Sequence, residues 1–231
     1  MPKHYIVTGA SRGIGFETAL YLSDRGHLVT AIARSADKLS ELVKKSDGKI
    51  QKLSLDLDSN GATDRIIQYL EMNNLRIDGL VNNAGLLIKR PFLESTDEEW
   101  QKQIHLNLLV PVRIVRNLIT FFNPACHILN IGSMGGFQGS SKFPGLSAYS
   151  VSKGALAILT ECLSEELQEQ NIIANCLCLG AVQTEMLNDA FPGYDAPIKP
   201  GQMGSYIGNF LIEGHHFYNG KILPVALNNP S

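Results

Sequence analysis

The chain has 231 residues, of which 44% are hydrophobic and 18% charged, and its formal net charge is -2. This length fits one compact domain, residues 1–231, and the composition is that of an ordinary globular protein. The charge provides no basic field for a phosphate backbone, so no nucleic-acid partner is expected. The chain enters a strand-like run at once, and no apolar stretch approaches the length of a membrane span. We therefore expect neither a signal peptide nor a membrane association.

The four cysteines lie in or beside apolar runs, without the spacing of zinc ligands. They are Cys126, Cys162, Cys176 and Cys178. Reduced thiols in the protein core are expected, which favours a reducing, cytoplasmic location. Cys176 and Cys178 alternate along an expected strand and should point to one face. Because no second pair of ligands accompanies them, core packing is a better interpretation than metal binding.

Short apolar runs alternate with longer segments of helical periodicity. The runs predicted as strands are His4–Thr8, Leu28–Ala33, Ile50–Leu55, Gly79–Asn82, Cys126–Gly132, Ile173–Leu179 and Lys221–Ala226. The segments predicted as helices are Ile14–Arg25, Lys38–Lys45, Ala62–Asn74, Glu98–Phe122 and Ala148–Gln170. This alternation predicts an α/β fold with a doubly wound parallel sheet of about seven strands.

The segment 184–220 breaks this rhythm, because prolines and glycines interrupt any long regular element in it. We expect a loop with one short helix around Gln202–Leu211. The segment follows the sixth strand at the carboxyl edge of the sheet, where α/β folds place segments that cover a substrate.

The first expected strand leads directly into a glycine-rich loop, Thr8–Gly15, which then opens a helix. Glycines allow a tight turn and a close approach of the backbone to a pyrophosphate. The start of the helix offers free N–H groups and the positive end of its dipole to the phosphates. The residues expected to bind the cofactor here are Gly9, Ser11, Arg12, Gly13, Ile14 and Gly15.

The spacing of this loop, T-G-x-x-x-G-x-G, resembles that of the short-chain dehydrogenase/reductase family, and the resemblance covers nearly the whole chain. It implies a Rossmann-type fold. Asn82–Gly85 after the fourth strand resembles the family's N-N-A-G motif, and Asp56 after the third strand matches its adenine-contacting aspartate. The resemblance places Asn83, Ala84, Gly85 and Asp56 on the adenosine side of the cofactor.

The end of the second strand discriminates between the two nicotinamide dinucleotides. A carboxylate there would accept a hydrogen bond from the ribose 2′-OH of NAD, but this chain has Arg34, whose guanidinium can bind the 2′-phosphate of NADP. Arg12 matches a second basic position that NADP-preferring members of the family use. Each arginine could be a solvated surface charge, but together their positions favour NADP(H).

Tyr149 and Lys153 are four residues apart on an expected helix, so their side chains share a face. A phenol with an ordinary pKa of about 10 is a poor acid–base catalyst near neutrality, and a neighbouring cation lowers that pKa, so we expect Lys153 to acidify Tyr149. Ser133, which ends the fifth strand, can donate a hydrogen bond to a substrate oxygen as negative charge develops. By resemblance, Lys153 also binds the nicotinamide ribose, and Asn107 binds a water that links Lys153 to solvent.

After the sixth strand the family usually has Pro-Gly, and this chain has Leu179 in place of the proline. Gly180, Val182 and Thr184 still stand where the resemblance places contacts to the nicotinamide, on a less rigid turn. Near the end of the chain, 225–227 replaces the common Val-Asp-Gly-Gly. Apolar residues near these positions could line a substrate cleft, namely Met134, Phe137, Phe143, Leu146, Met186, Leu187, Phe191 and Tyr194.

Together these features predict an NADP(H)-dependent oxidoreductase that moves a hydride between nicotinamide and the carbon of a small carbonyl or alcohol substrate, with Tyr149 as the acid/base. The alternative is a non-catalytic NADP(H)-binding or sensor protein that keeps the fold. The altered turn at Leu179 and the short segment after it are the features that favour this alternative. The resemblance also implies a homodimer or homotetramer, assembled through the two long helices.

Overall fold

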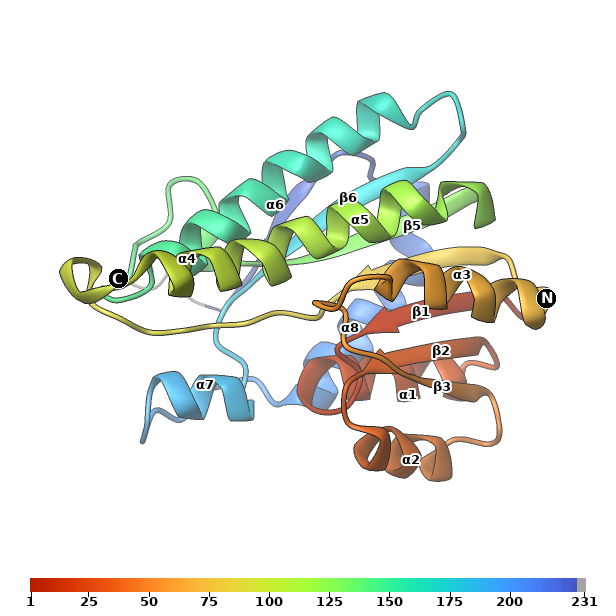
Figure 1. The fold of residues 1–231 in the computed structure, drawn as a ribbon, viewed down its shortest axis with the longest axis horizontal. Helices are drawn as coiled ribbons and strands as arrows, with labels where there is room; N and C mark the ends of the chain where they lie inside the picture. Colours follow the sequence, from red (N-terminus) through yellow and green to blue (C-terminus); the bar gives the residue numbers. More distant parts are fainter. Residues whose placement is uncertain (228–231) are drawn as a thin grey trace.

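The computed structural model describes residues 1–227, and its centre is one parallel sheet with the strand order β3-β2-β1-β4-β5-β6-β7 (Figure 1). The strands are β1 (His4–Thr8), β2 (Leu28–Ala33), β3 (Ile50–Ser54), β4 (Ile77–Asn82), β5 (Phe122–Ser133), β6 (Ile173–Leu179) and β7 (Ile222–Val225). All neighbouring strands are parallel. The strand order reverses between β1 and β4, which is the point where doubly wound sheets bind ligands. The expected seven-stranded Rossmann-type sheet is confirmed.

Helices cover both faces of the sheet (Figure 1). Alternate side chains of each strand feed two cores, so that Tyr5 and Val7 of β1 point to one face and Ile6 to the other. The helices of the first face are α1 (Gly13–Asp24), α2 (Ala36–Lys45) and α8 (Pro200–Glu213). Those of the second face are α3 (Ala62–Met72), α5 (Val110–Leu118) and α6 (Ser147–Glu166). Both faces of the central strands are therefore buried, as their continuous apolar runs indicate.

The helix predicted over Glu98–Phe122 is interrupted. It consists of α4 (Asp97–Ile104), a π-helical turn (His105–Leu109), α5 and a final 3-10 turn (Ile119–Phe121). By length and composition alone, the run from Asp97 to Phe121 could cross a membrane, which contradicts the expectation that no stretch approaches that length. A helix of a soluble core passes the same test, and α5 packs Ile114 and Leu118 against the sheet. The apolar character of α5 is accounted for by this packing.

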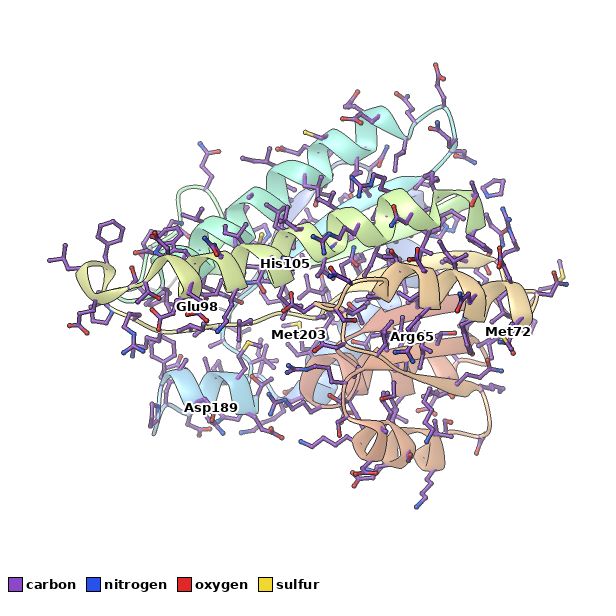
Figure 2. The ribbon with its side chains drawn as sticks, in the orientation of Figure 1. Arg65, Met72, Glu98, His105, Asp189 and Met203 are labelled. Carbon is purple, nitrogen blue, oxygen red and sulfur yellow. The ribbon has the colours of Figure 1, made fainter. Side chains whose placement is uncertain are left out.

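The segment 184–220 contains two helices instead of the one expected, α7 (Glu185–Ala190) and α8. Helix α8 is longer than predicted and packs closely along α1, because a Cβ atom on Gly204 would lie 2.5 Å from Cβ of Glu17. Met203, labelled in Figure 2, joins the same core as the buried residues of α1. Helix α8 is thus part of the core, whereas α7 stands apart from the sheet (Figure 1).

Candidate active site

The carboxyl ends of the central strands bring together most of the residues predicted to be functional. The glycine loop follows β1, Asn83–Gly85 follows β4, Ser133 ends β5 and Gly180 follows β6. In a parallel sheet these ends lie along one edge, on both sides of the point where the strand order reverses. The topology therefore places the expected cofactor and catalytic residues in one region.

The glycine loop and the Asn83–Gly85 segment form one rigid unit. The Thr8 hydroxyl oxygen accepts hydrogen bonds from the backbone N–H groups of Asn83 (3.0 Å) and Ala84 (3.1 Å), and the Asn83 amide donates to the Thr8 carbonyl (2.9 Å). Gly9 has φ +68°, and a Cβ atom there would lie 2.8 Å from Cα of Ala84. Only glycine fits this close approach. The Asn83 side chain thus supports the loop from behind.

The start of α1 is suited to bind a phosphate. Its N-cap residue, Arg12, has extended backbone angles, and its side chain does not cap the helix. The first-turn N–H groups therefore lack a side-chain acceptor, and with the helix dipole they favour an anion. A Cβ atom on Gly15 would lie 2.4 Å from the Asn83 amide nitrogen, so this position also requires glycine. The residues present fit the pyrophosphate of a dinucleotide.

The basic edge of this site differs in one respect from the expectation. Arg34 is exposed after β2, as predicted, but Arg12 pairs with Glu185, the first residue of α7. The Nζ atom of Lys38 lies 3.7 Å from the other carboxylate oxygen of Glu185. The hydrogen bond from Arg12, assisted by Lys38, lowers the pKa of Glu185. Asp56 is exposed, and its carboxylate accepts from the Asp58 backbone N–H (3.1 Å) within its own turn.

Ser133, Tyr149, Lys153 and Asn107 converge on one point. Tyr149 and Lys153 lie on α6, and the Lys153 ammonium lies 6.0 Å from the centre of the tyrosine ring. The Ser133 hydroxyl acts to lower the pKa of the Tyr149 phenol, so these two side chains are neighbours. A Cβ atom on Gly85 would lie 3.2 Å from the Asn107 side-chain oxygen and 3.5 Å from Lys153 Nζ. The catalytic residues expected from the sequence are therefore neighbours.

The protonation of this group differs from the expectation that Lys153 acidifies Tyr149. Burial raises the pKa of Tyr149 to about 12, although the residue keeps some solvent exposure, and the nearby Ser133 hydroxyl only partly opposes this rise. Burial also lowers the pKa of Lys153 to about 8. The Lys153 ammonium donates instead to the carbonyl of Ile131 (2.7 Å). At neutral pH Tyr149 is thus a phenol, which is a proton donor.

A buried hydrogen-bond network holds these residues, and it includes one residue that the sequence did not indicate. The Asn107 amide donates to the Leu86 carbonyl (2.8 Å) and to the Ser152 hydroxyl (2.9 Å), and its oxygen accepts from the Leu86 N–H (2.7 Å). The Ser152 hydroxyl donates to the Tyr149 carbonyl (2.7 Å). Ser152 therefore connects the π-helical turn to the turn of α6 that carries Tyr149. In the sequence, its position between Tyr149 and Lys153 is the feature that could have indicated Ser152.

The first turn of α7 lies against the glycine loop, and its far end lies on the expected substrate side. Thr184 caps α7, accepting from the Leu187 N–H (3.2 Å), and its methyl carbon would lie 3.4 Å from a Cβ atom on Gly13. The rings of Phe143 and Phe191 pack edge to face, with centroids 6.5 Å apart. Of the other residues suggested for a cleft, Met134 and Leu146 are buried, which indicates packing rather than substrate contact.

The two departures from the family pattern lie side by side. Leu179 of β6 pairs with Val225 of β7, and the Gly180 N–H donates to the Val225 carbonyl (2.9 Å). A Cβ atom on Gly180 would lie 2.8 Å from Cβ of Ala226. Val182 is buried and forms a parallel bridge with Ile198. These contacts fix the turn after β6 although it lacks the proline.

The cysteines are all free, and three are buried as expected, but Cys162 is exposed on the outer side of α6. Cys176 and Cys178 do share a face, with sulfur atoms 4.0 Å apart. Within residues 1–227, no three His, Cys, Asp or Glu side chains form a group that could hold a metal ion.

Comparison with known proteins assigns the family. A family model described as short chain dehydrogenase matches residues 3–195. The chain belongs to the short-chain dehydrogenase family. This is a family of oxidoreductases, so the glycine loop and the side chains of Ser133, Tyr149 and Lys153 lie in an oxidoreductase fold.

Three relatives illustrate the similarity. A short-chain dehydrogenase/reductase from Cladobotryum is 31% identical over 96% of this chain and 94% of its own length. The pig carbonyl reductase [NADPH] 2 is 33% identical over 78% of this chain and 72% of its own. The fatty acyl-CoA reductase of Acinetobacter baylyi is 31% identical over 80% of this chain, which spans only 64% of the length of that enzyme.

Solved structures are similar over the whole fold. A short-chain dehydrogenase from Shigella flexneri in complex with NADP has a TM-score of 0.87 at 26% identity, covering 96% of each chain. A 4-hydroxyisoleucine dehydrogenase in complex with NADH has a TM-score of 0.85 at 25% identity, covering 97% of each chain. The fold thus occurs with either nicotinamide cofactor.

Proposed function

We propose that this chain is an NADP(H)-dependent carbonyl reductase or alcohol dehydrogenase in which Tyr149 is the general acid/base. The observation that carries the proposal is the convergence of Ser133, Tyr149, Lys153 and Asn107 beside a glycine loop suited to a dinucleotide. A non-catalytic binding protein would have no need of a serine–tyrosine pair next to a buried lysine.

The residues present suggest how the reduction would proceed. The bound cofactor supplies the hydride. Ser133 and Tyr149 would hold the substrate oxygen between their hydroxyl groups, and both can donate to it as negative charge develops. Tyr149, which carries its proton at neutral pH, then transfers the proton to that oxygen. Lys153, held by the Ile131 carbonyl, would bind the nicotinamide ribose, and Asn107 and Ser152 keep this group in place.

The preference for NADP(H) is supported by charge rather than by family membership. Arg34 lies exposed after β2 with no acidic residue beside it in the sequence, and Arg12 lies at the start of α1. Guanidinium groups bind a phosphate bidentately, whereas NAD(H)-dependent folds of this type use an acid at this position for the ribose hydroxyl. Gly180 and Thr184 would face the nicotinamide end of the same cofactor.

We further propose that the protein acts in the cytoplasm on a small carbonyl or alcohol compound, as a homodimer or homotetramer. Support for the assembly comes from Leu109, Val151 and Ile158, which are apolar and exposed on the π-helical turn and on α6. Association through these faces would remove their apolar surface from water.

The test is Tyr149→Phe, which removes only the phenolic oxygen. Turnover of carbonyl compounds, followed by the absorbance of NADPH, should fall by about 10²- to 10⁴-fold, while the Kd for NADPH stays unchanged. Tyr206→Phe is the matched control, because Tyr206 is exposed on α8 and should not affect either quantity. Near-normal turnover by Tyr149→Phe would contradict the proposal. NADPH binding without turnover of any carbonyl compound by the unaltered protein would favour the sensor alternative.

A further inference from the structure

Glu185 occupies a position that the proposed function reserves for a phosphate. Its carboxylate lies between Arg12 from the start of α1 and Lys38 from α2, and it comes from α7, which is distant in the sequence. Within residues 1–227, this is the one ion pair that Arg12 forms. Arg34, the other basic residue of this edge, is exposed and lies four residues before Lys38 in the sequence.

We propose that Glu185 is a specificity-determining residue that competes with the 2′-phosphate of the cofactor for Arg12 and Lys38. The inference rests on the proposed function, which assigns this phosphate to the edge formed by Arg12 and Arg34. A carboxylate and a phosphate both use the paired N–H donors of a guanidinium, and two anions on the same donors repel each other. Glu185 therefore has to leave Arg12 before the phosphate can bind it.

Competition of this kind acts on only one of the two cofactors. NAD(H) carries a ribose hydroxyl where NADP(H) carries the phosphate, and a neutral hydroxyl does not have to displace a carboxylate. Glu185 thus lowers the affinity for NADP(H) and leaves that for NAD(H) nearly unchanged. Because the side chains of Arg12 and Glu185 are about half exposed, solvent screens their attraction. The expected effect is therefore modest, about three- to fivefold in Kd.

Displacement of Glu185 would also affect α7. Glu185 directly follows Thr184, whose methyl group faces the side of Gly13 where a Cβ atom would lie, and the C-cap residue of α7 is Phe191, which contacts Phe143. A phosphate that removes the carboxylate from Arg12 therefore removes one of the two contacts between the start of α7 and the glycine loop. The 2′-phosphate and the substrate side of the site are in this way connected by one short helix.

The experiment compares Glu185→Gln with Asp189→Asn, which removes the same charge from an exposed position on the same helix (Figure 2). The probes are adenosine 2′,5′-bisphosphate and 5′-AMP, titrated calorimetrically at low ionic strength. Glu185→Gln should bind the bisphosphate about three- to fivefold more tightly than the unaltered protein and bind 5′-AMP equally well. Asp189→Asn should alter neither affinity, and about 0.5 M salt should remove the gain.

The outcomes separate this inference from the proposed function. An unchanged affinity of Glu185→Gln for the bisphosphate, an equal gain for 5′-AMP, or an equal gain in Asp189→Asn would overturn the role of Glu185. If the unaltered protein binds both probes equally but Glu185→Gln prefers the bisphosphate, the inference stands and the proposed preference for NADP(H) fails. If the unaltered protein prefers the bisphosphate and Glu185→Gln does not differ from it, the inference about Glu185 fails and the proposed preference for NADP(H) stands.

Discussion

Ser152 shows how a single buried hydroxyl can determine the alignment of the residues proposed to be catalytic. It accepts from Asn107 and donates to the Tyr149 carbonyl, and it is fully buried. In Ser152→Ala one N–H of the Asn107 amide loses its acceptor in the interior, which should cost about 1–2 kcal/mol of unfolding free energy. We expect kcat to fall about tenfold or more, because small displacements of catalytic groups are costly, with little change in the Kd for NADPH.

The matched control for this change is Ser150→Ala. The Ser150 hydroxyl lies two residues earlier on the same helix and is buried, with no hydrogen-bond partner among residues 1–227. Its removal should leave stability and kcat unchanged or slightly raise stability. Steady-state kinetics and urea unfolding measure both variants, and an equal response of the two would show that Ser152 has no positioning role.

Among the elements, the contact between α1 and α8 determines how firmly the glycine loop is held. A Cβ atom on Gly204 would lie 2.5 Å from Cβ and 2.7 Å from the carbonyl carbon of Glu17, and the backbone of α1 cannot move aside cheaply. Gly204→Ala should therefore lower the unfolding free energy by about 2 kcal/mol and weaken cofactor binding, because the displaced helix follows the loop that we propose binds the phosphates.

Gly201→Ala provides the comparison on the same helix. There a Cβ atom would lie 3.6 Å from a carboxylate oxygen of Glu17, which is an ordinary contact. Alanine favours helix more than glycine, so the midpoint of thermal unfolding should stay the same or rise. Comparable losses in both variants, measured by calorimetry, would mean that α8 disfavours any added methyl group and that the close contact at Gly204 is not the cause.

The elements also show what could be predicted from sequence. Ile173–Leu179 was predicted to the residue, because a strand buried on both faces is a continuous apolar run. The π-helical turn was missed because one additional residue barely disturbs the helical periodicity of a long segment. Helix α7 has six residues between prolines and glycines, too few to show a pattern. The roles of Glu185 and Ser152 depend on partners 173 and 45 residues away, which local patterns do not reveal.

For the whole molecule, buried histidines make stability depend on pH. His127 is buried in β5, with Nδ1 3.0 Å from the Leu211 carbonyl and Nε2 3.0 Å from the Asn175 amide, and burial lowers its pKa to about 4. In the unfolded chain this histidine has a pKa near 6.5, so below that pH the unfolded chain binds a proton at His127 that the folded protein does not bind. This contribution to stability is complete above pH 6.5 and is lost as the pH falls toward 4. The loss is about 1.4 kcal/mol per pH unit.

Urea unfolding at pH 7.5 and pH 5.5 measures this dependence. His127→Asn should be less stable than the unaltered protein at pH 7.5 but should lose about 1 kcal/mol less between the two pH values. His4, whose pKa burial also lowers, supplies part of the remaining dependence. His216→Asn is the control because His216 is exposed. An identical pH dependence in His127→Asn and the unaltered protein would assign the effect to other groups.

The π-helical turn at His105–Leu109 has a consequence for how the chain tolerates changes in length. It adds one residue to the helix, and each residue of an α-helix turns the chain by about 100°. The wider π turn takes up this residue, so α4 and α5 keep nearly the phase of a regular helix that is one residue shorter. A deletion within α5, where no wide turn absorbs it, would instead rotate the following apolar side chains away from the sheet by that angle. Loss of one residue within the turn should therefore preserve the packing of α5 and act mainly on Asn107, which lies in the turn itself.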